Sequence, residues 1–130
     1  MSLGLALRLR AAGLAWTPRN GDRFLIPQPD LTDAVFVLSD LTVEVHEFPT
    51  GRVFGFNGTT EWALDSVQQR ATVWLPREDQ LRGLLGDAFA RLERVGGRHR
   101  VVLVGETSFE DADAEEAYGL AVLHQLSRRN

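Results

Sequence analysis

The chain contains neither cysteine nor lysine. The absence of cysteine excludes disulfides, thiol nucleophiles and cysteine-ligated metals. The absence of lysine excludes Schiff-base chemistry on a lysine amine and a Walker phosphate loop, which requires a lysine after its last glycine. All 14 basic residues are therefore arginines. Composition alone removes several large classes of enzyme.

Long apolar runs are also missing. No stretch approaches the roughly 18 apolar residues of a membrane-spanning helix, and the first residues lack the basic and then unbroken apolar order of a secretory signal. We therefore expect a cytoplasmic protein with no membrane partner. The 14 basic and 18 acidic residues give a net charge of −4, which repels nucleic acid, so we expect no nucleic-acid partner.

The length of 130 residues and the hydrophobic content of 44% suit one domain, and we expect a single α+β domain over residues 1–130. Ser2 can cap a first helix that Gly13 ends, with Leu14 returning onto Leu9. Short alternating or wholly apolar runs predict strands. The predicted strands lie at residues 23–26, 34–38, 43–48, 53–57 and 99–104.

The most completely specified stretch is 74–97, which predicts a central helix. Pro76 suits the first helical position, and Glu78 with Asp79 complements the helix dipole. The glycine pair 96–97 can take the left-handed conformation that ends a helix. The apolar side chains that recur at intervals of three and four are Leu81, Leu84, Leu85, Ala88, Phe89, Leu92 and Val95.

A final helix is predicted to begin at Asp113, an N-cap residue that would form a capping box with Glu116. Two opposite sides of this helix are apolar. Either a second layer of this chain or another chain must cover the second side, and exposed apolar patches usually mark interaction sites. We therefore expect a homodimer or partner surface formed by Tyr118, Val122 and Leu126.

Together these elements predict an α+β fold in which an antiparallel sheet of about five strands is packed by three main helices. The expected order is α-β-β-β-β-(short α)-α-β-α. The short helix is predicted at residues 61–67, where a threonine can cap its first turn.

Three stretches carry a resemblance to known proteins: GLAWTPRNGDRF, FGFNGTTEWALDSV and WLPREDQLRGLL. With them the chain resembles, over nearly its whole length, a family of small actinobacterial proteins, some of which carry the name pilus assembly protein of the CpaE type. A Trp-x-Pro-x-x-Gly-Asp-x-Phe turn, a Trp-x-Pro helix and an acidic-capped final helix are more distantly similar to small phage proteins with an α-β-α sandwich. This resemblance implies a fold and brings no catalytic residue.

Residues 55–60 form the strongest candidate ligand site. A glycine-rich turn between a strand and a helix N-terminus aims backbone N–H groups at one point, where a phosphate or carboxylate could sit. The spacing matches neither the Walker loop nor the dinucleotide fingerprint, and a plain turn that caps the short helix explains the same residues. The ring of Trp16 could line the same ligand site as an additional aromatic side chain. The predicted binding residues are Asn57, Gly58, Thr59, Thr60 and Trp62.

The remaining candidates for chemistry favour structural roles. His46, His99 and His124 lack the spacing of metal ligands, so we expect no metal site. The acidic run 106–116 does not follow the EF-hand order, and we expect a solvated loop that also charges a helix N-terminus. The sequence contains no nucleophile elbow or zinc-protease motif, and we assign no catalytic residue and no cofactor.

Two functions remain. The first, which we favour, is a cytoplasmic, non-enzymatic protein-interaction or adaptor module that forms a homo-oligomer or binds another protein. The alternative is a small-ligand or phosphate-binding protein that uses the turn at residues 55–60.

Overall fold

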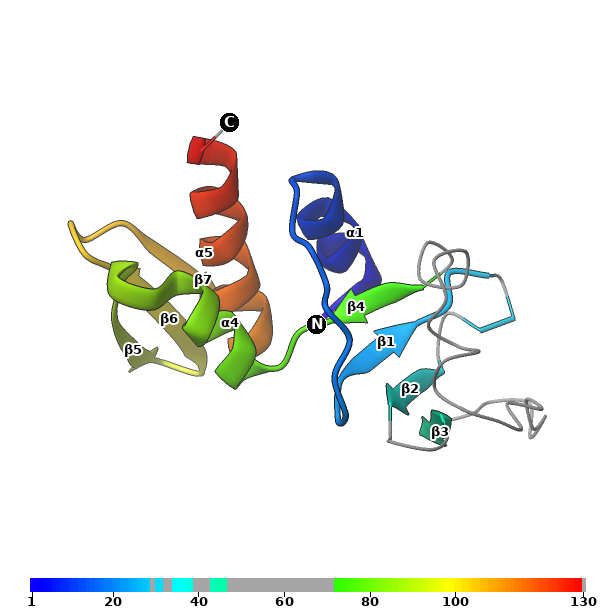
Figure 1. Ribbon diagram of the computed structural model, residues 1–130. Coiled ribbons are helices and arrows are strands. Elements are labelled where there is room, and N and C mark those ends of the chain that lie inside the picture. Colours follow the sequence, from blue (N-terminus) through cyan, green and yellow to red (C-terminus); the bar gives the residue numbers. More distant parts are fainter. Residues whose placement is uncertain (29, 32–33, 39–42, 47–71, 130) are drawn as a thin grey trace. The chain divides into compact units, whose positions relative to one another are not determined.

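The structure is a computed structural model, and it describes residues 1–28, 30–31, 34–38, 43–46 and 72–129. Figure 1 shows the helices and strands in the order of the chain. The α+β class is confirmed. The chain divides into two compact units: the terminal unit consists of Met1–Ala15 and Pro76–Asn130, and the central unit consists of Trp16–Leu75. The expectation of a single domain over residues 1–130 stays a prediction.

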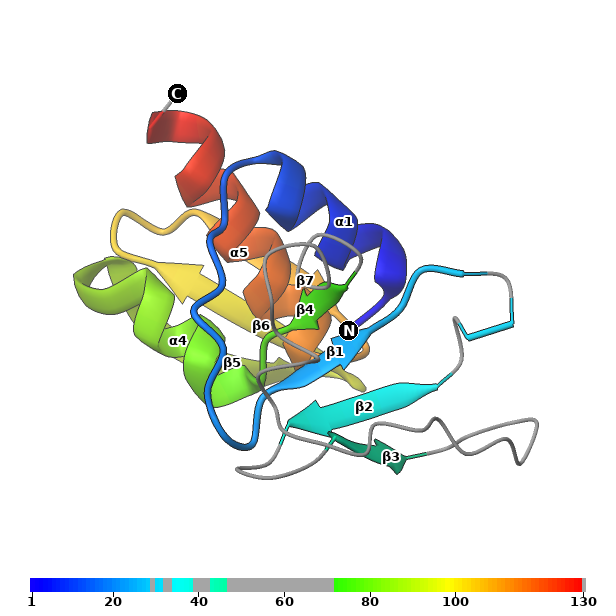
Figure 2. The ribbon, with the colours of Figure 1, turned by 45° about the vertical axis from the view of Figure 1, so that its right-hand side comes forward.

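The described part of the terminal unit contains a three-stranded antiparallel sheet of order β5-β6-β7. Helix α5 packs on β6 and β7, and both α1 and α4 pack against α5 (Figure 2). The bounds are Leu3–Ala11 for α1, Glu78–Leu85 for α4, Gly86–Ala88 for a short 3-10 helix, Phe89–Val95 for β5, Arg98–Leu103 for β6, Ser108–Asp111 for β7 and Ala114–Arg129 for α5.

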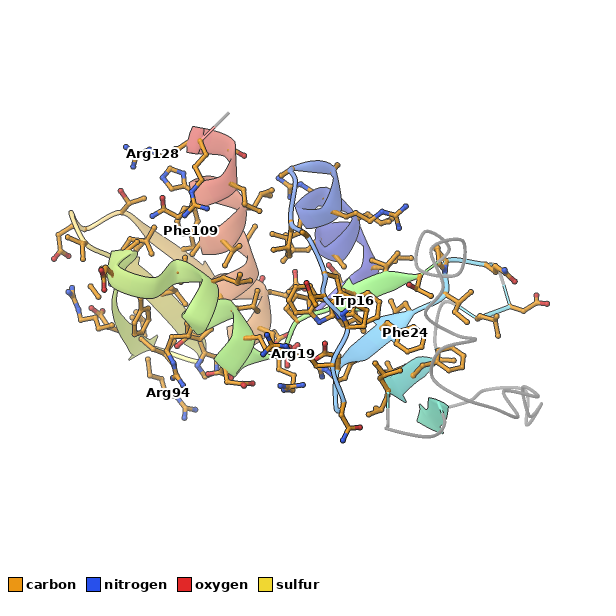
Figure 3. All side chains as sticks on the ribbon, in the orientation of Figure 1. Trp16, Arg19, Phe24, Arg94, Phe109 and Arg128 are labelled. Atoms are coloured by element: carbon orange, nitrogen blue, oxygen red, sulfur yellow. The ribbon has the colours of Figure 1, made fainter. Side chains whose placement is uncertain are left out.

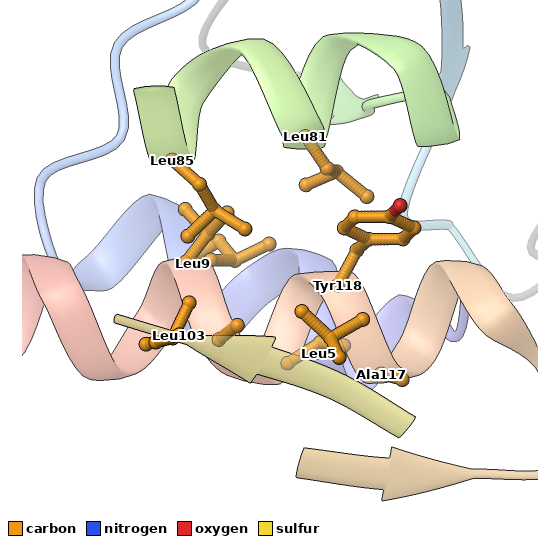
Figure 4. Packing of buried hydrophobic residues seen from close by; sticks show 10 residues of the cluster. Leu5, Leu9, Leu81, Leu85, Leu103, Ala117 and Tyr118 are labelled. Atoms are coloured by element: carbon orange, nitrogen blue, oxygen red, sulfur yellow. The ribbon is translucent and has the colours of Figure 1, made fainter. Parts of the chain in front are cut away.

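The core of the terminal unit lies where these helices meet the sheet. Tyr118 of α5 is fully buried among Leu5 of α1, Leu81 of α4 and neighbouring aliphatic side chains (Figure 4). Full burial of one large apolar side chain is worth about 1.5–3 kcal/mol before the entropy cost of folding. This core therefore joins two segments that are separated by the whole central unit in sequence.

The first helix has the predicted ends. The hydroxyl of Ser2 accepts a hydrogen bond from the backbone N–H of Leu5 at 3.2 Å. Gly13 has φ 104°, and the N–H of Leu14 donates to the carbonyl of Leu9 at 3.0 Å. This bond and the left-handed glycine are the features of a Schellman motif, so the helix stops because its last carbonyls are satisfied there.

The last helix also begins as predicted. The carboxylate of Asp113 accepts from the N–H of Glu115 at 3.1 Å, as an N-cap residue does. The capping box with Glu116 is wrong, because the N–H of Asp113 donates to the carboxylate of Asp111 at 2.8 Å. Glu116 instead accepts hydrogen bonds from the backbone N–H and the hydroxyl of Ser2. Its carboxylate therefore ties α5 to the start of α1.

The described part of the central unit is a four-stranded antiparallel sheet of order β3-β2-β1-β4. Its core contains the stacked rings of Phe24 and Phe36, whose centroids are 5.4 Å apart, and Trp16 lies beside Phe24 (Figure 3). The strands span Arg23–Leu25 for β1, Val35–Leu38 for β2, Val43–His46 for β3 and Val73–Leu75 for β4.

The predicted central helix is wrong beyond Leu85. Gly86 follows it with φ 55°, and after the 3-10 turn the chain becomes strand β5. The glycine pair 96–97 closes a β-hairpin, because Val95 pairs with Arg98 across it. The helical spacing of the apolar residues gave the wrong prediction because Leu92 and Val95 also suit a strand. Hydrogen bonding with β6 stabilises the strand.

The sheet prediction is corrected as well. The expected single sheet of about five strands is replaced by two sheets in the described residues. Trp74 and Leu75, which were predicted to belong to the central helix, lie in β4, and β7 was expected to be part of a loop. The predicted strands at 23–26, 34–38 and 99–104 are confirmed as β1, β2 and β6, and β3 matches the start of the strand predicted at 43–48. The strand predicted at 53–57 and the short helix at 61–67 lie outside the described residues.

Candidate interaction surface

The predicted ligand-binding turn cannot be located in the described part of the chain. Its residues Asn57, Gly58, Thr59, Thr60 and Trp62 lie outside the described residues. The ligand-binding alternative therefore stays a prediction. Trp16, the other expected aromatic wall, belongs to the central unit and stacks on Trp74 with ring centroids 6.2 Å apart and an interplanar angle of 7°.

The turn before β1 is held by a buried carboxylate. Asp22 is 2% exposed, and its Oδ2 accepts from the indole N–H of Trp16 at 2.9 Å and from the backbone N–H of Arg19 at 3.0 Å. Two donors on one buried oxygen fix the indole ring above the strand. The Trp-x-Pro-x-x-Gly-Asp-x-Phe motif is thus explained by folding of the central unit.

The expected interface residues on the last helix lie largely inside this chain. Tyr118 and Val122 are 0% and 3% exposed, and Leu126 is partly buried against the same core. Helices α1 and α4 both pack against α5. The second apolar side of α5 is therefore covered by a second layer of this chain, which was one of the two alternatives left open by the sequence.

The three histidines lie on three different elements. His99 lies on β6, and His124 lies on α5 with its ring centroid 5.3 Å from that of Phe109. His46 ends β3 in the central unit. Within the described residues, no group of three or more His, Cys, Asp or Glu side chains could hold a metal ion. In the same residues, no helix has the length and apolar character required to cross a membrane.

The acidic run is more structured than the loop that we expected, since residues 108–111 form β7. Glu110 receives two hydrogen bonds from the guanidinium of Arg100, at 3.1 and 2.8 Å. Asp113 and Glu115 lie 3.7 and 3.1 Å from the N-terminal ammonium group of Met1. These carboxylates are therefore partnered within the terminal unit.

One face of the β5-β6-β7 sheet carries a network of opposite charges, which we call the charged face. The register places Glu93 of β5, Arg100 of β6 and Glu110 of β7 in one row across the three strands. Arg100 contacts Glu93 at 3.4 Å and Glu110 at 2.8 Å. Arg91 contacts Glu93 at 2.5 Å and Glu106 at 3.0 Å. Opposite charges directly across a sheet stabilise the strand pairing.

The hydrogen bonds of Arg91 change the acidity of its partner. They hold the pKa of Glu106 below its usual value, and the two carboxylates beside Arg91, Glu106 first, raise the pKa of the guanidinium. Both groups are exposed, so solvent screens the pair and its effect on stability is small. Both shifts favour the charged forms of Arg91 and Glu106 at neutral pH.

Strand β5 forms an edge of this sheet. In the described residues it pairs with β6 on one side, and the sheet ends at β5. Its seven residues include two exposed large apolar side chains, Leu92 at 39% and Val95 at 36%. An edge strand presents a row of backbone N–H and C=O groups that another strand can pair with.

Sequence reasoning missed this edge strand because it assigned the same residues to a helix. A signal for the strand was present: two glycines stand between FARLERV and RHRVVLV, two runs that combine apolar and charged residues. A glycine pair between two such runs indicates a two-residue hairpin.

Comparison of the chain with family models, with curated proteins and with solved structures finds no match. The resemblance to the actinobacterial family and to the phage sandwich proteins therefore stays a prediction.

Proposed function

We propose that this chain is a protein-interaction module whose contact surface is the edge of β5 together with the adjoining charged face. The observation that carries the proposal is the exposure of Leu92 on a seven-residue edge strand. Partner strands add to such edges through main-chain hydrogen bonds, while side chains along the strand give specificity.

The composition of β5 supports this function. Proteins usually protect an exposed edge with charged side chains, proline, a β-bulge or a very short strand. Strand β5 spans Phe89–Val95 and contains no proline, although it carries three charged residues and one register irregularity between Phe89 and Arg91. Beyond that irregularity the strand is regular through Val95, which leaves a stretch that another strand can join.

The charges along the same strand favour binding to a specific partner over nonspecific association. The strand carries a positive, a negative and a positive charge at Arg91, Glu93 and Arg94. An incorrect partner or register would therefore bring like charges together. Repulsion of this kind selects partners more strongly than apolar contact alone. The surface is therefore suited to one strand of complementary charge.

The test uses Leu92→Glu and the matched control Leu84→Glu. Leu84 is 41% exposed on α4, so the control makes the same change at an equally exposed position away from β5. Both variants and the natural chain are used for affinity capture with cross-linking from native cell lysate, after circular dichroism shows that each is folded. We expect Leu92→Glu to lose captured proteins that Leu84→Glu keeps. Identical capture by all three chains would refute a binding role for the β5 edge.

A further inference from the structure

We infer that the strand that pairs with β5 is β5 of a second copy of this chain, aligned antiparallel about a two-fold axis at Leu92. The inference rests on the proposed function, since it uses the same edge, and it names the partner. The observation behind it is that two antiparallel copies of β5 are complementary in charge and in the direction of their backbone N–H and C=O groups.

The hairpin fixes which backbone groups of β5 face away from β6. Val95 and Arg98 flank the two-residue turn, and a β-turn of this kind is closed by a hydrogen bond between its first and last residues. Hydrogen-bonded and non-hydrogen-bonded pairs alternate along an antiparallel ladder. Glu93 therefore bonds toward β6, while the N–H and C=O groups of Leu92 and Arg94 point away from β6.

A two-fold axis at Leu92 satisfies this geometry. It places Leu92 opposite the partner's Leu92, where the two residues exchange both of their outward-facing hydrogen bonds. It also places Arg91 opposite the partner's Glu93, and by symmetry this pair occurs twice. The axis thus joins one apolar pair and two pairs of opposite charge.

The neighbouring axes fail on charge. An axis at Arg91 or Arg94 would place two arginines directly opposite each other, and an axis at Glu93 would place two glutamates there. Like charges directly across a strand pair are destabilising. The register is therefore selected by the order Arg-Leu-Glu-Arg at 91–94.

The pairing extends contacts that already exist in one copy. The row Glu93, Arg100 and Glu110 would continue through the partner's Arg91, so charges alternate from one sheet into the next. Leu92, which is 39% exposed in the single chain, would be covered by its own counterpart. The result is a continuous six-stranded sheet of order β7-β6-β5-β5-β6-β7.

The first experiment measures the mass of the full chain by sedimentation equilibrium at micromolar concentrations. We expect a dimer for the natural chain. Arg91→Glu alone sets two glutamates opposite each other, and Glu93→Arg alone sets two arginines opposite each other. Each should weaken dimerisation by roughly tenfold or more, because two cross-strand pairs change sign in one dimer.

The decisive sample is an equal mixture of these two variants. In the mixed pair, Glu at position 91 of one chain faces Arg at position 93 of the other, and the second cross-strand pair keeps its natural residues. We expect the mixture to dimerise as the natural chain does. Damage to contacts within either chain cannot explain such a recovery, since each chain keeps its defect. Arg94→Glu is the matched control and should leave the dimer unchanged, because Arg94 faces the partner's Ala90.

Amide hydrogen exchange gives a second measurement on the natural chain. Raising the protein concentration should slow exchange at Leu92 and Arg94, whose N–H groups face the edge, and leave Glu93 and Val95 unchanged. A monomer at all concentrations, a dimer whose mixture does not recover, or exchange at Leu92 that ignores concentration would each overturn the inference. If the chain is monomeric while Leu92→Glu still loses partners from lysate, the proposed function stands and only the second copy is rejected.

Discussion

Gly119 of α5 lies directly against Leu5 of α1. A Cβ atom built on Gly119 would be 2.6 Å from Cδ2 of Leu5 and 3.1 Å from Cε of Met1. A contact of that length is too short for two carbon atoms, so the two helices meet where α5 has no side chain. This close approach joins the first residues of the chain to its last helix.

Gly119→Ala is therefore expected to destabilise the protein by about 1–3 kcal/mol, since overpacking a buried contact outweighs the gain of up to about 1 kcal/mol in helix propensity. Gly83→Ala is the matched control. Gly83 lies within α4, and an added Cβ there meets nothing within 4 Å. We expect the control to be stabilising. Urea unfolding of both variants measures the two signs, and a stabilising Gly119→Ala would show that the helices can separate freely.

Tyr118 gives a prediction for alkaline pH. Burial raises the pKa of its phenol above the ordinary value of 10.0, although the nearby guanidinium of Arg82 acts in the opposite direction. As the pH rises, the unfolded chain therefore loses the phenolic proton before the folded chain does. The phenol contributes stability that is present below pH 10 and is lost as the pH rises through the folded pKa. The chain has one tyrosine, so phenolate absorbance reports this group alone.

The measurement is a spectrophotometric titration of folded and urea-unfolded protein. We expect the folded midpoint to lie higher, and we expect Tyr118→Phe to remove that part of the alkaline loss of stability. Equal midpoints in the two states would show that the phenol is solvated in the folded protein.

Asp22 gives a prediction for the central unit. Asp22→Ala would leave the indole N–H of Trp16 and the backbone N–H of Arg19 without this acceptor. Each lost bond to a buried group costs about 1–3 kcal/mol, so we expect a clear fall in unfolding free energy. Tryptophan fluorescence should shift at the same time, because the ring of Trp16 loses its anchor.

Asp87→Ala serves as the comparison for Asp22→Ala, since Asp87 is exposed in the 3-10 turn of the terminal unit. We expect that change to stay within about 0.5 kcal/mol of the natural chain. If both substitutions cost the same, the carboxylate of Asp22 does not anchor the turn.

Local signals explain the parts of the fold that were predicted correctly. Ser2, Gly13 and Asp113 act on backbone groups within a few residues of themselves, so their capping roles follow from sequence alone. The strands β1, β2 and β6 were found for a related reason. Their apolar content and the turn residues around them are properties of short stretches.

Residues 86–97 show where local signals fail. Leu84, Leu85, Leu92 and Val95 fit a helical spacing, yet Gly86 ends α4 and the chain turns into β5. Hydrogen bonding with β6 determines the outcome, and that pairing depends on residues further along the chain. The candidate surface was missed for the same reason, since an edge exists only once the sheet has formed.

The sequence by itself determined the α+β class, the caps of α1 and α5 and the absence of cysteine and lysine chemistry, because composition and capping act locally. Only the tertiary structure decided that Tyr118 and Val122 are buried and that Leu92 is exposed on an edge. The physical reason is that burial of a side chain depends on which distant elements pack against it. Here α1 and α4 cover α5, while among the strands that the structure describes the sheet ends at β5.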